Sequence, residues 1–270
     1  MMSIIYLKLR GDYMKLFVTE RREKILELLN EKRRLTVKEL SKQIGVSQAT
    51  LRTDLNELES ENLLVRTHGG AMLNEDLEDT SFYFRAKQNK GEKERIANTA
   101  IDLLQDKQTI LLDASSTVME LATLIKSSNL RITVLTSSIQ TAAVLKDNPS
   151  ITVVIIGGVV TSGSTSVEGK LGLDILNHFN IDLLFTSGSG FTSDKGLTDF
   201  NLYEVELKTE MVKQAKKVIA LVDHTKIGQN SSSVFAKSSE IDTLITDSPV
   251  SKDISTQLNK EKIQLLIPDN

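Results

Sequence analysis

The sequence contains no cysteine. This absence excludes disulfide bonds, thiol catalysis and cysteine-ligated zinc, and it fits a reducing compartment. No apolar run approaches the ~20 residues that a membrane-spanning helix needs, so we expect a cytoplasmic protein without a membrane partner. The start of the chain lacks the small-residue cleavage site of a signal peptide, and we interpret residues 1–14 as a flexible N-terminal extension.

The chain as a whole has no large excess of either charge, since its net charge is −3, but the charged residues are unevenly distributed. Residues 1–70 hold 13 Lys and Arg against 10 Asp and Glu, whereas the rest of the chain holds 20 against 26. A mildly basic N-terminal region on an acidic body suggests that any polyanion binds at the N-terminal end. The 270 residues suffice for a small domain and a larger one with its own core.

Apolar periodicity in the first 60 residues predicts a helix-turn-helix. Residues 20–30 carry apolar side chains at helical spacing. Thr36 and Glu39 have the spacing of a capping box, which predicts a helix from residue 37, and Gly45 is suited to end it. The following helix, 47–60, has an apolar face of three leucines at i, i+4 and i+7: Leu51, Leu55 and Leu58.

The face opposite these leucines has the character of a DNA-reading surface. It carries short polar groups, one arginine and no bulky apolar residue, which suits contact with base edges. Hydroxyl groups near the start of a helix can donate hydrogen bonds to phosphates. Residues 63–70 are predicted to form a wing that follows the helix. The residues predicted to contact double-stranded DNA are Thr36, Ser47, Gln48, Ala49, Thr50, Arg52, Thr53, Asn56, Arg66 and His68. Spacing alone leaves open an interaction adaptor that uses this fold without DNA and binds without steep salt dependence.

Beyond residue 109 the chain alternates between strand-like and helical stretches. Apolar, β-branched runs separated by helices are typical of a parallel sheet with helices on both faces, so we expect a doubly wound α/β domain. We assign residues 15–71 to the winged helix-turn-helix, 72–90 to a linker and 91–270 to the α/β domain. The strand-like runs are 109–113, 131–136, 151–158, 182–188, 217–223, 242–247 and 263–268.

Ligands of such sheets bind beyond the carboxyl ends of the strands. Hydroxyls, glycines and carboxylates follow several of the runs, and the helix start at residues 113–117 offers amide groups and a dipole to a phosphate. Asp113, Asp182 or Asp223 could accept hydrogen bonds from sugar hydroxyls, and Lys226 could supply positive charge. Ser115 and Ser137 belong to the same predicted rim.

The motifs VSQATLRTDLNELE and RTHGGA of the N-terminal region resemble the DeoR family of bacterial transcriptional regulators. The segments LLDASSTVMELA, VLTSS, DLLFTSGSGFTSDKGLT and LVDHTKIG resemble the effector domain of that family, which is similar in fold to ribose-5-phosphate isomerase. The resemblance implies a repressor of a carbohydrate-utilisation operon that a phosphorylated sugar releases from its operator. It implies that the effector is held by the positions that match Asp113, Ser116, Thr117, Gly158, Lys208 and Lys226.

Several other functions are weighed against this one. A sugar-phosphate isomerase would use Asp182 with Glu204 or Glu206 as acid and base, and Lys226 to stabilise an enediolate. Gly188 and Gly190 are a fragment of a dinucleotide motif without its third glycine. The three histidines are far apart in sequence, so we expect no metal site. We also expect no cofactor and no catalytic residue. We expect a non-enzymatic regulator that works as a homo-oligomer, a dimer or a tetramer.

Overall fold

The structure is a computed structural model that describes residues 18–60, 63–72, 82–161 and 164–268. The chain divides into two compact units, Met1–Ser81 and Phe82–Asn270. The expected N-terminal extension, 1–14, lies outside the described residues. Within the expected linker, 72–90, Met72 ends a strand of the first unit and residues 82–87 form a helix of the second unit.

The first unit contains three helices and a small antiparallel sheet with the strand order β1-β3-β2. The wing expected at residues 63–70 is formed by β2 and β3, which pair from Val65 with Met72 to Thr67 with Gly70. β1 was not predicted and joins the wing as a third strand. The elements are α1 (Val18–Lys32), β1 (Arg34–Thr36), α2 (Val37–Ile44), α3 (Gln48–Ser60), β2 (Val65–Thr67) and β3 (Gly70–Met72).

Local signals set the ends of the middle helix, α2. Thr36 accepts a hydrogen bond from the Glu39 amide and Glu39 accepts one from the Thr36 amide, so both halves of the capping box form. Gly45 ends the helix with a φ of 78°, a left-handed conformation that glycine adopts without a steric penalty. The predicted start at residue 37 is therefore confirmed. The core between the helices is leucine-rich: Ile25, Leu26, Leu29, Leu40, Leu51, Leu55, Leu58 and Leu64.

The second unit is built on a seven-stranded parallel sheet with the order β13-β12-β10-β7-β4-β5-β6. All seven predicted runs form its strands, which confirms the doubly wound α/β class. The strands are β4 (Thr109–Leu112), β5 (Ile132–Thr136), β6 (Ile151–Ile155), β7 (Ile181–Thr186), β10 (Ala215–Leu221), β12 (Thr243–Ile245) and β13 (Gln264–Leu266).

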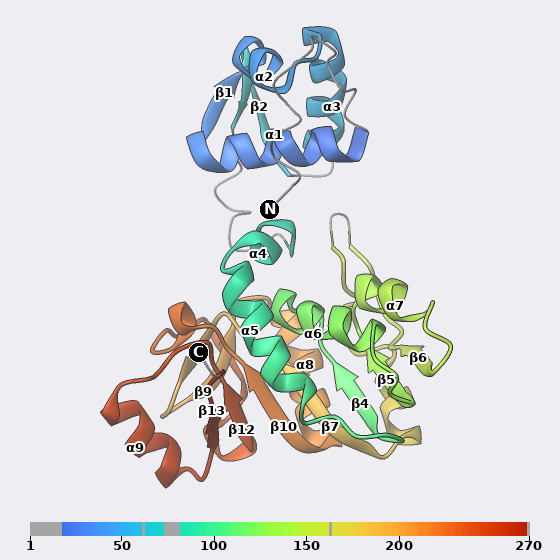
Figure 1. The fold of residues 1–270 in the computed structure, drawn as a ribbon, viewed down its shortest axis with the longest axis vertical. Coiled ribbons are helices and arrows are strands. Elements are labelled where there is room, and N and C mark those ends of the chain that lie inside the picture. The colour runs from blue at the N-terminus through green and yellow to red at the C-terminus, as the bar shows by residue number, and fades with distance from the viewer. Residues whose placement is uncertain (1–17, 61–62, 73–81, 162–163, 269–270) are drawn as a thin grey trace. The chain divides into compact units, whose positions relative to one another are not determined.

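Alternate residues of each strand belong to different apolar cores, one on each face of the sheet. In β7, Leu183 and Phe185 pack on one face and Leu184 on the other. The first face is covered by α5 (Lys90–Ile101) and α6 (Ser116–Lys126), which cross in front of the sheet in Figure 1, and by α7 (Ile139–Leu145). The opposite face is covered by α8 (Leu202–Gln214) and α9 (Lys252–Lys260). This two-sided burial explains why the strands read as continuous apolar runs.

Smaller elements were not predicted from the sequence. Between β7 and β12 the chain adds a three-stranded antiparallel sheet of order β11-β9-β8. Its strands are too short for a clear alternation, because each holds three or four residues. The remaining elements are β8 (Gly190–Thr192), β9 (Gly196–Asp199), β11 (Ser233–Ala236), α4 (Phe82–Lys87), η2 (Leu173–His178), η3 (His224–Lys226) and η4 (Ser238–Glu240).

Two adjacent glycines of the wing provide a matched test of this packing. A Cβ at Gly70 would lie 2.0 Å from the Leu35 carbonyl oxygen, whereas a Cβ at Gly69 would meet nothing within 4 Å. We expect Gly70→Ala to lower the free energy of unfolding of the first unit by about 1–3 kcal/mol, because β1 and β3 must separate. Gly69→Ala should change it by less than about 0.5 kcal/mol. Calorimetric unfolding checks both, and equal destabilisation would contradict the β1–β3 pairing.

Candidate functional site

Helix α3 presents a polar face away from its leucines. Gln48, Ala49, Arg52, Thr53 and Asn56 are exposed, as the periodicity predicted, and Thr50 is half-buried. Ser47 precedes the helix, and its Oγ accepts a hydrogen bond from the Thr50 amide at 3.1 Å, which fixes the first turn. The exposed face carries one cation and small side chains, so it could approach a base-lined groove closely.

The wing is held against this helix by a contact that the sequence did not predict. Arg66 Nη1 donates to Asn56 Oδ1 at 2.5 Å and to the Arg52 carbonyl oxygen at 3.4 Å. Both Arg66 and Asn56 are therefore already engaged in the first unit, and Arg66 sets the position of the wing. His68 is exposed in the turn between β2 and β3, and Thr36 is exposed at the α2 cap.

A buried ion pair fixes α3 on α1. Asp54 is 2% exposed. Its carboxylate accepts hydrogen bonds from Arg21 Nε at 2.5 Å and Nη2 at 2.9 Å. Such bidentate pairing fixes orientation as well as distance. Asp54 belongs to the motif that carried the resemblance, but its role is to orient the helix from inside.

The second candidate site lies at the carboxyl edge of the parallel sheet. Asp113 follows β4, Ser137 follows β5, Ser187 follows β7 and Asp223 follows β10, and all four side chains are buried. The side chains of Ser116 and Thr117 are buried in the first turn of α6, and the Ser115 hydroxyl caps that helix by accepting from the Val118 amide at 3.3 Å. These residues converge as the strand topology predicted.

Asp113 joins the two central strands at this edge. Its Oδ2 accepts hydrogen bonds from Thr186 Oγ1 at 2.7 Å and from the Ser187 amide at 3.0 Å. Its Oδ1 accepts one from the Ser115 amide at 2.9 Å. Asp113 is fully buried, so its structural role is to shape the loops that surround the site.

Lys208 of α8 is a buried cation among three carboxylates. Its Nζ lies 2.8 Å from Asp199, 3.6 Å from Asp113 and 3.7 Å from Glu204. It also donates to the Ser187 carbonyl oxygen at 3.0 Å. Burial favours the neutral amine, but the three carboxylates outweigh it and raise the pKa of Lys208.

The carboxylates around Lys208 respond differently to their burial. Burial opposes the ionisation of Asp199, but the Lys208 ammonium outweighs this effect and the pKa of Asp199 lies below its ordinary value. Burial dominates at Glu204, whose pKa is raised. Lys208 therefore holds a charged cluster together and has several protein partners of its own.

Several buried polar atoms at the same edge lack a hydrogen-bond partner within the described part of the chain. Leaving such atoms unpaired is costly, so they point to a ligand or to water at this edge. Thr117 lies in the first turn of α6, Ser187 directly after β7 and Thr246 directly after β12. The atoms are Thr117 Oγ1, Ser187 Oγ, Asp223 Oδ2, Thr246 Oγ1 and Arg85 Nε.

Positive charge collects beside these atoms. Burial lowers the pKa of Lys226, and the charges of Asp223 and Arg85 act on it in opposite directions. Lys93 of α5 is 2% exposed, and burial followed by repulsion from Lys226 lowers its pKa to about 8. The sequence did not single out Lys93 or Arg85, because a lysine in an amphipathic helix normally faces solvent.

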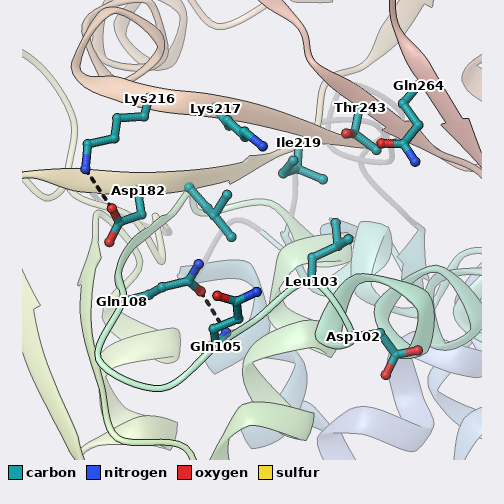
Figure 2. A pocket seen from close by; sticks show the side chains of 11 residues that line it. Asp102, Leu103, Gln105, Gln108, Asp182, Lys216, Lys217, Ile219, Thr243 and Gln264 are labelled. Carbon is teal, nitrogen blue, oxygen red and sulfur yellow. Dashed lines mark hydrogen bonds and ion pairs between the residues drawn. The ribbon is translucent and has the colours of Figure 1, made fainter.

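Asp182 was predicted for this site, and that prediction is wrong. It is the second residue of β7, so it lies at the amino edge of the sheet, where it accepts hydrogen bonds from the Thr109 amide and from Lys216 Nζ, both at 2.9 Å. Figure 2 shows Asp182 and Lys216 in a hollow of about 470 Å³ there. The predicted run 182–188 already began with Asp182, so strand direction placed this aspartate at the amino edge, and counting it with the carboxyl rim disagreed with that run.

The other predicted position of the rim, Gly158, follows β6 and has a φ of 155°. A Cβ there would lie 2.6 Å from the Glu168 carbonyl oxygen, so the glycine permits the close pairing of residues 159 and 168. Within the described ranges, no helix is long and apolar enough to cross a bilayer. The described His, Asp and Glu residues form no cluster suited to a metal ion.

Comparison with known families matches both units. The DeoR C terminal sensor domain matches residues 88–248, more than half of the chain, and the DeoR-like helix-turn-helix domain matches residues 21–76. The chain belongs to the DeoR family of transcriptional regulators. The winged unit of this DeoR-family chain is thus its DNA-binding domain, and the parallel-sheet unit is its sensor domain.

Curated relatives span nearly the whole chain. The HTH-type transcriptional regulator GolR of Listeria innocua is 44% identical, covering 88% of this chain and 93% of that protein. The glycerol-3-phosphate regulon repressor of Escherichia coli is 32% identical, covering 92% and 98%. Among solved structures, ribose 5-phosphate isomerase A from Methanocaldococcus jannaschii is 16% identical with a TM-score of 0.39, covering 52% of this chain and 55% of that one.

The Lys208 cluster makes a testable prediction about stability and pH. Lys208→Met leaves the buried Asp113 and Asp199 and the half-buried Glu204 without their cation, so we expect the free energy of unfolding to fall by about 3–5 kcal/mol at pH 7. The lowered pKa of Asp199 stabilises the wild type at neutral pH, and this contribution is lost as pH falls. In the variant, the ammonium no longer offsets the burial of Asp199, so this carboxylate takes up a proton at a higher pH and the deficit of the variant should narrow below about pH 5.

Lys213→Met is the matched control, because Lys213 lies on the same helix and is exposed. Urea unfolding of both variants between pH 4 and pH 8 checks the prediction. A deficit for Lys208→Met that stays constant over this range would contradict the electrostatic account.

Proposed function

We propose that this chain is a transcriptional repressor that a phosphorylated sugar releases from its operator. The first unit reads double-stranded DNA with α3, and the second unit binds the sugar at the carboxyl edge of its sheet. The observation that carries the sensing half is the set of buried polar atoms at that edge, next to Lys226 and Lys93, that find no hydrogen-bond partner among the described residues. Hydroxyl and carboxylate groups suit a polyol, and the ammonium groups of the half-buried Lys226 and the buried Lys93 suit a phosphate.

Two properties follow for the working protein. One α3 helix contacts only a few base pairs, so we propose a homo-oligomer, a dimer or a tetramer, that places helices in successive turns of the major groove. We also propose that it acts in the cytoplasm, where the operator is found.

Sensing fits this edge better than catalysis does. The isomerase hypothesis paired Asp182 with Glu204 or Glu206, but Asp182 lies at the opposite edge of the sheet and Glu206 is ion-paired with Lys170 on the surface. Glu204 is already ion-paired with Lys208. We therefore propose binding without turnover, which incubation with aldose phosphates and a search for ketose products would test.

The DNA-reading half is tested by Arg52→Ala. Arg52 is exposed on the polar face of α3, and its loss should weaken operator binding by about 1–3 kcal/mol if the guanidinium contacts a base. Arg131→Ala is the control, since Arg131 is an exposed arginine of the second unit. Fluorescence anisotropy on operator DNA over a salt series measures both. Unchanged affinity for Arg52→Ala removes that residue from the reading surface, and a flat salt dependence of the wild type favours a DNA-independent adaptor.

The sensing half is tested by Lys226→Ala. A thermal-shift panel of sugar phosphates first identifies a compound that stabilises the wild type, since a ligand of the folded state raises its melting temperature. We expect Lys226→Ala to keep operator affinity but to lose both the thermal shift and the release from DNA. Lys252→Ala, an exposed lysine on α9, should behave as the wild type. A Lys226→Ala protein that the compound still releases would exclude Lys226 from the site.

A further inference from the structure

The turn that joins α4 to α5 lies at the boundary of the sensor unit. α4 is the first element after residues 73–81, through which the chain passes from one unit to the other. Figure 1 shows α4 at the N-terminal end of α5. Contacts that fix this turn therefore also fix the first residues of the sensor domain, which directly follow the connection from the DNA-binding domain.

The buried ammonium group of Lys93 caps the C-terminal end of α4. Lys93 Nζ donates to the Arg85 carbonyl oxygen and, at 2.7 Å, to the Gln88 carbonyl oxygen. The last carbonyl groups of a helix have no partner within it, and a cation there is favourable. An ammonium group has three protons. Two of them are used by these carbonyls, and Lys93 has no carboxylate within ion-pair distance among the described residues.

The same turn is tied to residues of the carboxyl edge. Asn89 adopts a left-handed conformation with a φ of 50°, and its Nδ2 donates to Asp223 Oδ1 and to Thr225 Oγ1, both at 3.2 Å. Among the residues that the structure describes, the buried Nε of Arg85 has no hydrogen-bond partner. The Arg85 charge acts to lower the pKa of Glu204, Lys226 and Lys93.

We propose that the turn at residues 85–93 is one wall of the effector site and transmits occupancy of the site to the connection with the DNA-binding domain. This inference rests on the proposed sugar-phosphate function. Two donors on this wall have no partner within the described part of the chain, the third proton of Lys93 and the Nε of Arg85, and an anion at the carboxyl edge can engage both. Ligand binding there stabilises the contacts that hold α4. The ligand can shift the equilibrium between DNA-bound and free protein only if it binds more tightly when this turn is ordered than when it is not.

Two variants loosen the turn in different ways, and hydrogen exchange of the full chain reports on it. Lys93→Met removes the ammonium. Asn89→Gly removes the amide contacts to Asp223 and Thr225 while keeping a residue suited to positive φ. Lys90→Met is the control, because Lys90 is an exposed lysine of the same helix.

Without ligand, we expect amide exchange in residues 83–88 to accelerate about tenfold in Lys93→Met, as expected for the loss of a charged hydrogen bond. The acceleration should be smaller in Asn89→Gly and absent in Lys90→Met. If amide exchange in residues 83–88 is unchanged in both Lys93→Met and Asn89→Gly, these two side chains do not hold the turn and the inference is overturned.

With ligand, the probes are ribose 5-phosphate, glucose 6-phosphate and glycerol 3-phosphate. The probe that stabilises the wild type should slow exchange in residues 83–88 and release operator DNA. In Asn89→Gly, we expect the probe still to raise the melting temperature but to release DNA at least about fivefold less effectively, a coupling of ordinary size for an allosteric protein.

The outcomes separate the two proposals. This inference alone fails if a probe stabilises the wild type and releases it from operator DNA without changing amide exchange in residues 83–88. It also fails if the probe releases Asn89→Gly from operator DNA as readily as it releases the wild type. If no probe stabilises the wild type, the proposed sensing function fails, and this inference fails with it.

Discussion

The Lys208 ammonium joins elements that meet only at the carboxyl edge of the sheet. Asp113 comes from the end of β4, Asp199 from the end of β9 and Glu204 from the same helix as the lysine. Asp113 and Asp199 are buried, so removing the cation would leave carboxylates in the interior without a compensating charge. Because Asp113 also fixes Thr186 and Ser187, the shape of the neighbouring loops depends on this one charge.

A comparable arrangement organises the DNA-binding domain. Asp54 is buried against Arg21, which fixes α3 on α1, and Arg66 fixes the wing on α3 through Asn56. In both units, buried or shared charges orient the groups that face outward. The exposed face of α3 is therefore presented by a rigid frame, as recognition of a groove requires.

Much of this fold could be predicted from the sequence. The seven strands of the sheet were predicted because each is an apolar run buried on both faces, and α2 because its capping box and Gly45 mark its ends. The gathering of Asp113, Ser116, Thr117 and Asp223 at one edge followed from strand direction alone. These signals are local, or follow from a general rule of parallel sheets.

The parts that escaped prediction depend on contacts between distant residues. Asp182 is a different case, because it was the first residue of the predicted run 182–188 and strand direction alone would have placed it at the amino edge. Lys93 looks like a solvent-facing lysine until α4 is seen to end against it. The Arg66–Asn56 contact joins residues ten apart on a strand and a helix, and no periodicity encodes it.

The central claim is that a phosphorylated sugar binds at the carboxyl edge of the sensor sheet. Mapping its footprint by backbone amide chemical shifts, with the sugar phosphate that raises the melting temperature most, tests this claim directly. The account predicts that the largest changes fall on residues 113–118, 187–189 and 223–226. Changes centred instead on the hollow around Asp182, Lys216 and Gln264 would place the ligand at the amino edge and contradict it.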